Sequence, residues 1–417
     1  MTQPRNVCLW EDTTKEAEPP SDDMPAAVDV AVIGAGFFGL SCALRLAESG
    51  LSVAVIEKGR VGAGASGRNG GQVQAGFGTD PGALAAGAGP EQEAEIREIA
   101  ATCADRVFDL AARHEIACDP VRAGLIRGVH HTRLVEKMRA KAEADPALEW
   151  WSAGRTAEAL GMPHFHGAIF DPRAGRIEPM GFARGLARAA RSHGAKLVTG
   201  TPVQALARAG GGWRIDTAKG SLQAGSAVLA TNTYTDAVNR TVQQSLVAVN
   251  SFQIATEPFE GGPLSGGQIA SDTRRLVYYF RRDAEGRLIV GGRGTLSGTD
   301  DLRRYGFLQD WIKHSFPGQA RLKLSHYWAG RVGITPDHVP HFHIPADGLF
   351  ILCGFNGKGV ALATALGERL ARHIAGEPPS VLGLPARPLR PIPFWRFRNL
   401  GVSAHVALYR LLDRHGR

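Results

Sequence analysis

Apolar residues follow one another in two short runs near the beginning of the chain. The first run starts at Val28 and reads VDVAVIG, and the second extends from Leu51 to Ile56. Between the two runs, apolar residues recur at helical spacing, at Leu40, Ala43, Leu44 and Ala47. Gly50 stands where such a helix would end. The pattern predicts a buried strand, an amphipathic helix and a second buried strand, which together make one βαβ unit.

Three glycines occupy the connection between the first predicted strand and the helix. Gly34, Gly36 and Gly39 form the pattern GxGxxG, which allows a tight turn, close approach of a pyrophosphate and close packing of helix on strand. Glu57 ends the second strand, where a carboxylate can accept hydrogen bonds from an adenosine ribose. Because all these parts occur in order, the unit predicts a dinucleotide site rather than a glycine-rich turn without a ligand.

The loop after the second strand indicates which dinucleotide binds. The segment GRVGAGASGRNGGQ combines many glycines with Ser66, Arg68, Asn69 and Gln72, and its free N–H groups can wrap a large anionic ligand. With this loop, the sequence resembles the D-amino-acid oxidase, glycine oxidase and sarcosine oxidase superfamily of FAD enzymes. Within that superfamily it most resembles the gamma-glutamylputrescine oxidase branch.

Three later segments carry the same resemblance, so that it extends from about Val28 to the C-terminus. They are Ala230 to Tyr234 (ATNTY), Tyr327 to Asp337 (YWAGRVGITPD) and Gly354 to Val360 (GFNGKGV). The resemblance implies an α/β protein, α+β overall, in which a Rossmann-type FAD-binding domain is interleaved with a substrate domain built on a mixed sheet. It also implies non-covalent FAD, because the second segment has no cysteine where sarcosine oxidases place their flavin-tethering thiol.

The motifs and the resemblance together predict the residues that contact FAD. These are Gly34, Ala35, Gly36, Phe38, Gly39, Glu57, Lys58, Ser66, Arg68, Asn69, Gly70, Gly71, Gln72, Val203, Thr231, Asn232, Gly330, Gly354, Asn356, Gly357, Lys358, Gly359 and Val360. We expect the FAD-binding domain to comprise residues 27–75, 161–235 and 326–380, and the substrate domain to comprise residues 76–160 and 236–325.

Two β-rich runs, Leu276 to Arg281 and Leu288 to Gly292, predict a hairpin in the substrate domain. The resemblance places such strands in a sheet above the flavin, which makes Tyr278, Phe280 and Arg281 candidates for contact with the substrate. The alternative is that these side chains pack in the core or on the surface of the sheet.

Two cationic residues are predicted to take part in catalysis. Lys358 lies in the glycine loop that opens a predicted helix, where a positive charge would stabilise reduced flavin; the alternative is a lysine exposed to solvent. Arg331 resembles the arginine with which glycine oxidases hold a substrate carboxylate, and a guanidinium suits that bidentate contact. An ion pair between Arg331 and Asp337 is the alternative for this residue.

Together these features imply an FAD-dependent oxidoreductase that oxidises the C–N bond of a small amine or amino acid. Hydride would pass to flavin N5, and the imine would hydrolyse to a carbonyl product. Ile289 stands where sarcosine oxidases carry an oxygen-activating lysine. The electron acceptor could therefore be oxygen or another molecule, such as a quinone or a carrier. An FAD-binding dehydrogenase subunit or a non-catalytic flavin-binding module is the alternative. An NAD-dependent dehydrogenase would leave the GASGRNGGQ and GFNGKG segments unexplained.

The two ends of the chain lack nucleotide motifs. Residues 1–26 are acidic and have no long apolar run, so we expect a flexible arm rather than a secretory signal. Residues 381–417 combine aromatic and apolar residues with arginines and predict a basic amphipathic tail. Such a tail could lie on a membrane surface. Packing on the FAD-binding domain is the commoner arrangement and is the one we expect.

Charge and composition narrow the classes of function. The net charge of +8 comes from basic residues interspersed with acids, which argues against nucleic-acid binding. Five cysteines without CxxC pairs favour reduced thiols in a cytoplasm, and no run reaches the roughly 18 apolar residues of a membrane span. His338, His341 and His343 are not spaced for a closed metal site, so we expect no metal. The expected partner is the small-molecule substrate, and the oligomeric state stays open.

Overall fold

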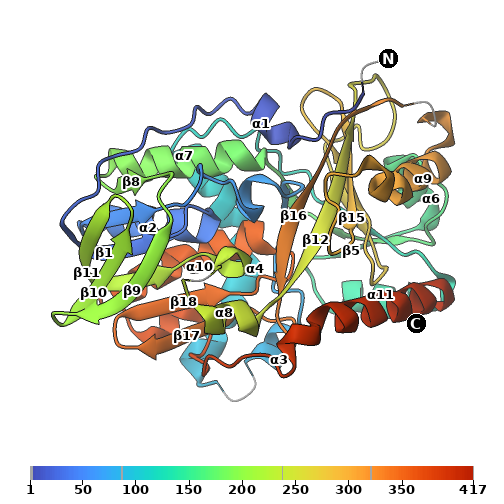
Figure 1. The fold of residues 1–417 in the computed structure, drawn as a ribbon. Coiled ribbons are helices and arrows are strands. Elements are labelled where there is room, and N and C mark those ends of the chain that lie inside the picture. The colour runs from blue at the N-terminus through green and yellow to red at the C-terminus, as the bar shows by residue number, and fades with distance from the viewer. Residues whose placement is uncertain (1–2, 86–87, 237, 320–321, 417) are drawn as a thin grey trace.

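The computed structural model describes residues 3–85, 88–236, 238–319 and 322–416. Within these residues the chain forms two large sheets, each of eight strands, and a separate two-stranded pair. Figure 1 shows strands of the first sheet (β1, β11, β18) and of the second (β12, β15, β16) in different halves of the molecule, with α2, α4 and α10 beside the first.

The first sheet contains the predicted nucleotide-binding unit. Its strands follow the order β17-β18-β11-β1-β2-β8, and β10 and β9 extend from β11. They are β1 (Ala27–Ile33), β2 (Val53–Ile56), β8 (Lys196–Val198), β9 (Val203–Ala209), β10 (Gly212–Thr217), β11 (Gly220–Leu229), β17 (His341–Ala346) and β18 (Leu349–Cys353). Ile33 pairs in parallel with Ile56 and Leu229, so the carboxyl ends of three strands meet at one edge.

Helices cover one face of this sheet. They are α2 (Phe37–Glu48), α4 (Pro90–Arg113), α7 (Pro179–Ser192) and α10 (Gly359–Ile374). α2 packs against α7 and α10, and α10 packs against α4. Val30 and Val32 of β1 enter this core, whereas Ala31 and Ile33 enter the core on the opposite face, since successive side chains of a strand alternate.

The second sheet is mixed, as the resemblance implies. Its order is β16-β12-β15-β14-β13-β4-β6-β5, and β13 pairs with β4 in parallel while the other pairs are antiparallel. The strands are β4 (Leu125–Gly128), β5 (Glu149–Trp151), β6 (Ala168–Asp171), β12 (Val247–Thr256), β13 (Ile269–Asp272), β14 (Tyr279–Arg282), β15 (Leu288–Arg293) and β16 (Leu324–Ile334). Helix α9 (Gly306–Ser315) contributes Leu308 and Ile312 to its core. The predicted fold class is confirmed.

The remaining elements connect or flank the sheets. They are α1 (Leu9–Thr13), α3 (Pro81–Leu84), α5 (Val135–Glu143), α6 (Ala153–Leu160), α8 (Arg240–Ser245), α11 (Arg398–His415), β3 (Gln72–Val73) and β7 (Gly175–Arg176). In the part of the chain that the structure describes, every helix is too short or too polar to cross a membrane.

The chain passes between the two sheets at positions other than the predicted boundaries. β6 and most of β16 fall in the segments assigned to the FAD-binding domain, yet both strands belong to the second sheet. α4 falls in a segment assigned to the substrate domain, yet it packs on α10 in the core of the first sheet. Apolar periodicity predicts an element but does not indicate which of two cores the element joins.

The N-terminal segment is packed against the rest of the protein, which contradicts the expected flexible arm. Trp10 is fully buried. Glu16 pairs with Arg188 at 2.9 Å, and Asp22 pairs with Arg191 at 2.8 Å. Figure 1 shows this dark blue segment passing over α7 before it reaches β1. The acidic composition that suggests a solvated arm instead supplies partners for arginines on α7.

The C-terminal tail is divided between the two domains. Its first part packs on the FAD-binding domain, as expected, since Leu382 and Leu384 enter the core of the first sheet and the N–H of Arg387 donates to the carbonyl of Phe342 on β17 at 2.8 Å. Helix α11, which follows, contacts the substrate domain instead. The carboxylate of Asp413 accepts hydrogen bonds from the backbone N–H groups of Arg275 and Leu276 at 2.7 and 3.0 Å. The carbonyl of Asp413 lies 3.2 Å from Nε2 of His130. Figure 1 shows α11 in red below the second sheet. The docking position therefore depends on loops of the second sheet that helical periodicity does not reveal.

Candidate active site

The glycine motif lies at the carboxyl end of β1, where α2 begins. Gly34 has a φ of +113°, a backbone conformation that favours glycine. A Cβ atom at Gly36 would lie 2.8 Å from Oγ of Ser66, and one at Gly39 would lie 2.1 Å from the carbonyl oxygen of Gly34. Gly36 is the N-cap of α2, and the N–H of Phe37 donates to Oγ of Ser66 at 3.0 Å. The positive end of the helix dipole faces the adjoining space. This geometry supports the role predicted for each glycine.

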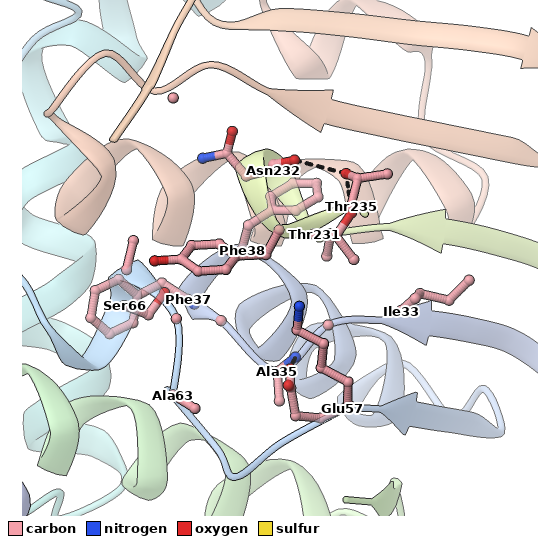
Figure 2. A pocket seen from close by; sticks show the side chains of 18 of the residues that line it. Ile33, Ala35, Phe37, Phe38, Glu57, Ala63, Ser66, Thr231, Asn232 and Thr235 are labelled. Carbon is pink, nitrogen blue, oxygen red and sulfur yellow. Dashed lines mark hydrogen bonds between the residues drawn. The ribbon is translucent and has the colours of Figure 1, made fainter. Parts of the chain in front are cut away.

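A cavity of about 870 Å³ opens beside this motif. Figure 2 shows how Phe38 of α2, Glu57 at the end of β2, Ser66 of the loop after β2, and Thr231 and Asn232 of the segment after β11 surround it. The predicted FAD contacts that line it are Gly34, Ala35, Gly36, Phe38, Glu57, Lys58, Ser66, Asn69, Val203, Thr231, Asn232, Asn356, Gly357, Gly359 and Val360. The fold thus gathers residues from distant parts of the sequence around one cavity.

The backbone holds the carboxylate of Glu57 in place. Oε2 accepts a hydrogen bond from the N–H of Ala35, and Oε1 accepts one from the N–H of Gly59, each at 2.8 Å. The carboxylate keeps lone pairs for ribose hydroxyls. The adjacent Lys58 pairs with Asp236, so its charge is already engaged at the rim of the cavity.

The glycine-rich loop after β2 is organised by its own side chains. The amide nitrogen of Asn69 donates to the carbonyls of Ala65 and Ser66 at 3.1 and 2.7 Å, and its oxygen accepts from the N–H of Gly71 at 2.8 Å. A Cβ atom at Gly71 would lie 2.1 Å from the carbonyl oxygen of Ile177. Gly71 therefore allows a close approach of two backbones and does not line the cavity itself.

The C-terminal glycine motif follows β18 and is tied to the segment after β11. Oδ1 of Asn232 accepts a hydrogen bond from the N–H of Gly354 at 3.1 Å, and Oδ1 of Asn356 accepts one from the N–H of Thr335 at 2.9 Å. A Cβ atom at Gly354 would lie 2.2 Å from Cγ2 of Thr335. Gly354 is thus required for packing, while Asn356 and Gly357 line the cavity.

Lys358 is the N-cap residue of α10 and points into the protein. Its Nζ donates to the carbonyl of Ala75 at 3.2 Å. Burial, reinforced by the positive charge of Arg127, lowers the pKa of the Lys358 amine to about 7. Lys358 is half-buried and lines a cavity, so it is not a fully exposed surface lysine. A buried amine at a helix N-terminus is well placed to stabilise negative charge.

A second cavity, of about 590 Å³, adjoins the first. The residues that line both are Ala65, Asn69, Arg331, Val332, Asn356, Gly357 and Val360. The predicted FAD contacts Arg68, Gly70, Gln72, Gly330 and Lys358 line the second cavity. The two cavities share this part of their walls, and together their lining reaches from the glycine motif to the second sheet.

Arg331, on β16, borders both cavities. Its guanidinium lies 5.4 Å from the ring centre of Tyr234, and its backbone N–H donates to the hydroxyl of that tyrosine at 3.2 Å. Asp337, the alternative partner, instead pairs with Arg387 and His341. Arg331 has no ion-pair partner among the described residues, so its charge is available to an anionic ligand.

Comparison with known proteins establishes the family. Residues 29–373 match the DAO family model, described as FAD dependent oxidoreductase. The chain belongs to this family. It is 32% identical over 424 residues to a probable oxidoreductase OrdL of Rhizobium meliloti (strain 1021), with 97% of each chain covered. It is 27% identical to the gamma-glutamylputrescine oxidoreductase of Escherichia coli (strain K12), with 93% of each covered. The crystal structure of glycine oxidase from Geobacillus kaustophilus matches with a TM-score of 0.71 and 22% identity over 84% of this chain and 95% of that one.

The predicted cofactor, FAD, is confirmed by membership of this FAD-dependent family. The site fits such a cofactor, since Gly36 places no side chain at the N-terminus of α2 and the two cavities share part of their lining. A polar atom also lacks a partner beside the glycine-rich loop. Nε2 of Gln253 donates to the carbonyl of Arg68 at 2.6 Å, but Oε1 of Gln253 is buried without a hydrogen-bond donor among the described residues. A ligand that donates a hydrogen bond would satisfy it.

The three substrate-contact candidates on the predicted hairpin line neither cavity in the DAO-family fold. Phe280 is fully buried in the core of the second sheet, and the ring of Tyr278 stacks on Trp311 with their centres 5.3 Å apart. Arg281 is also buried, and its guanidinium donates to the carbonyl of Gly70. The prediction of substrate contact is therefore wrong for all three. Arg281 instead supports the loop that is predicted to contact flavin.

Tyr279 is the residue of this strand that faces the second cavity. Its hydroxyl lies 2.6 Å from Oγ of Ser251, and burial raises the pKa of Tyr279 to about 12, so the phenol stays neutral. Adjacent strand residues point to opposite faces, which places Tyr278 and Phe280 away from the cavity. The sequence YYF is aromatic on both faces, so polarity does not reveal which face meets the cavity. Gln253 is a polar amide within the largely apolar run SFQIAT, and this pattern could have predicted a buried polar contact at that position.

No cysteine lines either cavity. The cysteines are free and buried, and burial raises the pKa of the Cys353 thiol to about 12. Ile289 packs in an apolar cluster with Trp10 and Trp328, so it contributes no cation to the site. The residues that the structure describes contain no group of three or more side chains placed to hold a metal ion.

Proposed function

We propose that the protein oxidises the C–N bond of a small amine or amino acid, with FAD bound non-covalently across the two joined cavities. The proposal rests chiefly on the second cavity, which borders the predicted flavin contacts and is lined by Arg331 and Lys358. FAD supplies the hydride acceptor, and water hydrolyses the imine that results. Relatives named glycine oxidase and gamma-glutamylputrescine oxidoreductase support this class of substrate.

Four residues would have distinct roles toward the cofactor. Gly36 would leave room for the pyrophosphate at the N-terminus of α2, and Glu57 would accept hydrogen bonds from the adenosine ribose. Lys358, at the N-terminus of α10, would stabilise the negative charge of reduced flavin. Gln253 would accept a hydrogen bond from the ligand through its unpaired Oε1. The lack of a cysteine in the lining of both cavities supports non-covalent binding.

The remaining polar residues of the second cavity would bind and orient the substrate. Arg331 would hold a substrate carboxylate through two parallel hydrogen bonds. Tyr279, whose hydroxyl contacts Ser251, would present a neutral polar group at the cavity wall. Positioning of this kind accounts for most of the protein's contribution, because the cofactor carries the difficult chemistry.

A dehydrogenase that passes its electrons to a carrier other than oxygen is the second candidate. The observation that favours it is the apolar packing of Ile289 with Trp10 and Trp328, at a position where the resemblance to sarcosine oxidases would place a lysine. Free thiols fit a reducing compartment, so we place the protein in the cytoplasm.

Flavin reduction without oxygen tests the proposed function. The FAD-loaded protein is mixed anaerobically with polyamines, gamma-glutamylated amines, N-methyl amino acids, glycine derivatives and D-amino acids, and the visible flavin absorption is followed. Bleaching by one class supports the proposal, and re-oxidation by oxygen or by a quinone then separates oxidase from dehydrogenase. A flavin that dithionite bleaches but none of these compounds does would favour a non-catalytic flavin-binding module. Acid precipitation should release the flavin into the supernatant.

A further inference from the structure

We infer that the second cavity selects an amine that carries a second anionic group, held by Arg127 and Lys141 in addition to the carboxylate assigned to Arg331. The inference rests on the proposed function and extends it to a class of substrate. Arg331 borders both cavities, whereas Arg127 and Lys141 line only the second. The two positions are therefore on different parts of the cavity wall.

Arg127 extends from β4 into the cavity without a partner. Its guanidinium forms no hydrogen bond or ion pair with any residue that the structure describes, while its backbone pairs with β13 and β6. Asp171 and Asp272 interact electrostatically with Arg127, but each forms an ion pair with another arginine. Asp171 pairs with Arg173 at 2.8 Å, and Asp272 pairs with Arg274. A desolvated guanidinium without a counter-ion is costly, and an anionic ligand would offset that cost.

Lys141 faces the same cavity from α5. Burial lowers the pKa of Lys141, and the positive charge of Arg127 lowers it further. The charges of Arg127 and Lys141 also lower the pKa of Lys358. Of the two acids whose charges act on Lys141, Asp145 pairs with an arginine and Asp80 caps α3. Mutually repelling cations around one cavity indicate a ligand of opposite charge.

The ligand class follows from the two cationic positions. One anionic group would meet Arg331 at the junction of the cavities, and a second would meet Arg127 and Lys141 on the wall that the first cavity does not reach. An amino dicarboxylate or an N-carboxyalkyl amino acid has this arrangement. A phosphoryl group would also suit a guanidinium and an ammonium, so the test includes both anions.

Binding of unreactive acids to the FAD-loaded protein tests the second position, with perturbation of the flavin spectrum as the readout. The probes are glutarate, which has two carboxylates, glutaramate, in which an uncharged amide replaces one of them, and 4-phosphonobutyrate, in which a phosphonate replaces one of them. We expect wild type to bind glutarate or the phosphonate at least about tenfold more tightly than glutaramate, the size of effect expected for a charged hydrogen bond. Arg127→Met and Lys141→Met should each abolish most of this preference. Arg139→Met, on α5 with its guanidinium over Trp150 and outside the cavity lining, should retain it.

Equal binding of glutarate, the phosphonate and glutaramate by wild type would overturn the inference, as would an unchanged preference in both methionine variants. Arg127→Lys keeps the charge and should retain part of the preference, which tests the position even if Arg127→Met folds poorly. Flavin reduction by amines is measured separately. If amines reduce the flavin normally but the protein shows no preference for a second anionic group, only the inference is overturned. If the preference is intact but no amine reduces the flavin, only the proposed function is overturned.

Discussion

A single side chain at Gly36 should be enough to prevent retention of FAD. Its Cβ atom would lie 2.8 Å from Oγ of Ser66, and a larger group would fill the space predicted for the pyrophosphate. We expect Gly36→Leu to purify without flavin, measured as the ratio of flavin to protein absorption after gel filtration. Gly154→Ala is the matched control, because a Cβ atom at Gly154 meets no atom within 4 Å. Full flavin content in Gly36→Leu would show that this glycine does not face the pyrophosphate.

The charge of Lys358 should raise the reduction potential of the bound flavin. Its amine is buried and has a pKa of about 7, so it is mostly charged below that pH and mostly neutral above it. Lys358→Met should lower the midpoint potential, and the difference from wild type should shrink as the pH rises through that pKa. Spectroelectrochemical titration about one unit on either side of the pKa measures this. Lys358→Arg should keep the higher potential, and equal potentials in all three proteins would assign Lys358 a purely structural role.

Arg331 should bind the substrate carboxylate that lies near the reacting amine. Arg331→Ala should raise the dissociation constant by about tenfold or more, the effect of losing a charged hydrogen bond worth on the order of 1.5–3 kcal/mol. An uncharged amide analogue of the substrate should lose little further affinity in the variant. Anaerobic titration of both proteins with both compounds forms a double-mutant-style cycle. If the two losses simply add, Arg331 does not touch the carboxylate, and a polyamine becomes the better substrate candidate.

At the scale of elements, α1 and the residues around it support, from outside, the glycine-rich loop that is predicted to contact flavin. Trp10 is fully buried, its indole N–H donates to the carbonyl of Asn69 at 2.8 Å, and its ring lies 6.1 Å from that of Trp328 in an edge-on arrangement. The guanidinium of Arg281 lies 4.8 Å from the Trp10 ring. The N-terminal segment therefore completes the layer behind the loop.

Trp10→Ala should destabilise the protein and loosen FAD. Removal of a fully buried tryptophan costs about 3–5 kcal/mol of the free energy of unfolding, because it leaves a cavity as well as losing apolar burial. Urea unfolding followed by fluorescence and by flavin release measures both effects. Trp10→Phe keeps most of the packing and loses mainly the hydrogen bond to Asn69, so its loss should be smaller. Flavin retention and stability equal to wild type in Trp10→Ala would mean that the N-terminal segment does not support the site.

At the scale of the whole molecule, α11 contacts the second sheet through a few polar contacts. The helix has no buried residue, and its apolar side chains include the exposed Leu400, Leu408 and Leu411. Its closest polar link is the carboxylate of Asp413, which accepts from the N–H groups of Arg275 and Leu276. The helix should therefore detach without loss of the FAD site.

Asp413→Ala should release α11 while flavin binding is retained. The substitution removes the acceptor for two backbone N–H groups, a loss of roughly 1–3 kcal/mol in docking of the helix. Limited proteolysis or hydrogen exchange of the tail should show increased exposure, while the flavin spectrum stays unchanged. Asp347→Ala is the control, because Asp347 is exposed and lies 4.0 Å from Arg208 on the first sheet. Unchanged protection of the tail in Asp413→Ala would show that other contacts dock the helix.

The sequence by itself determined the nucleotide-binding unit and the family. Gly34, Gly36, Gly39 and Glu57 all lie in one short βαβ segment. The geometry of that unit is standard, so their positions in the sequence are enough to predict their relative positions in the fold. The C-terminal glycine motif is local in the same way, since it joins β18 to α10. Both could be interpreted residue by residue because backbone conformation and helix dipoles depend on neighbours in sequence.

The tertiary structure alone decided which side chains meet in the second cavity. Tyr279 faces it while its neighbours do not, and Arg127 and Lys141 reach it from β4 and α5, which no sequence motif connects to the glycine segments. The acidic N-terminal segment packs on the protein because Trp10 is buried beside Trp328 and because arginines of α7 pair with its carboxylates. Both the lining of the second cavity and the packing of the N-terminal segment depend on how distant segments pack and on which neighbouring charges are already paired. Local periodicity and motif spacing predict neither of these.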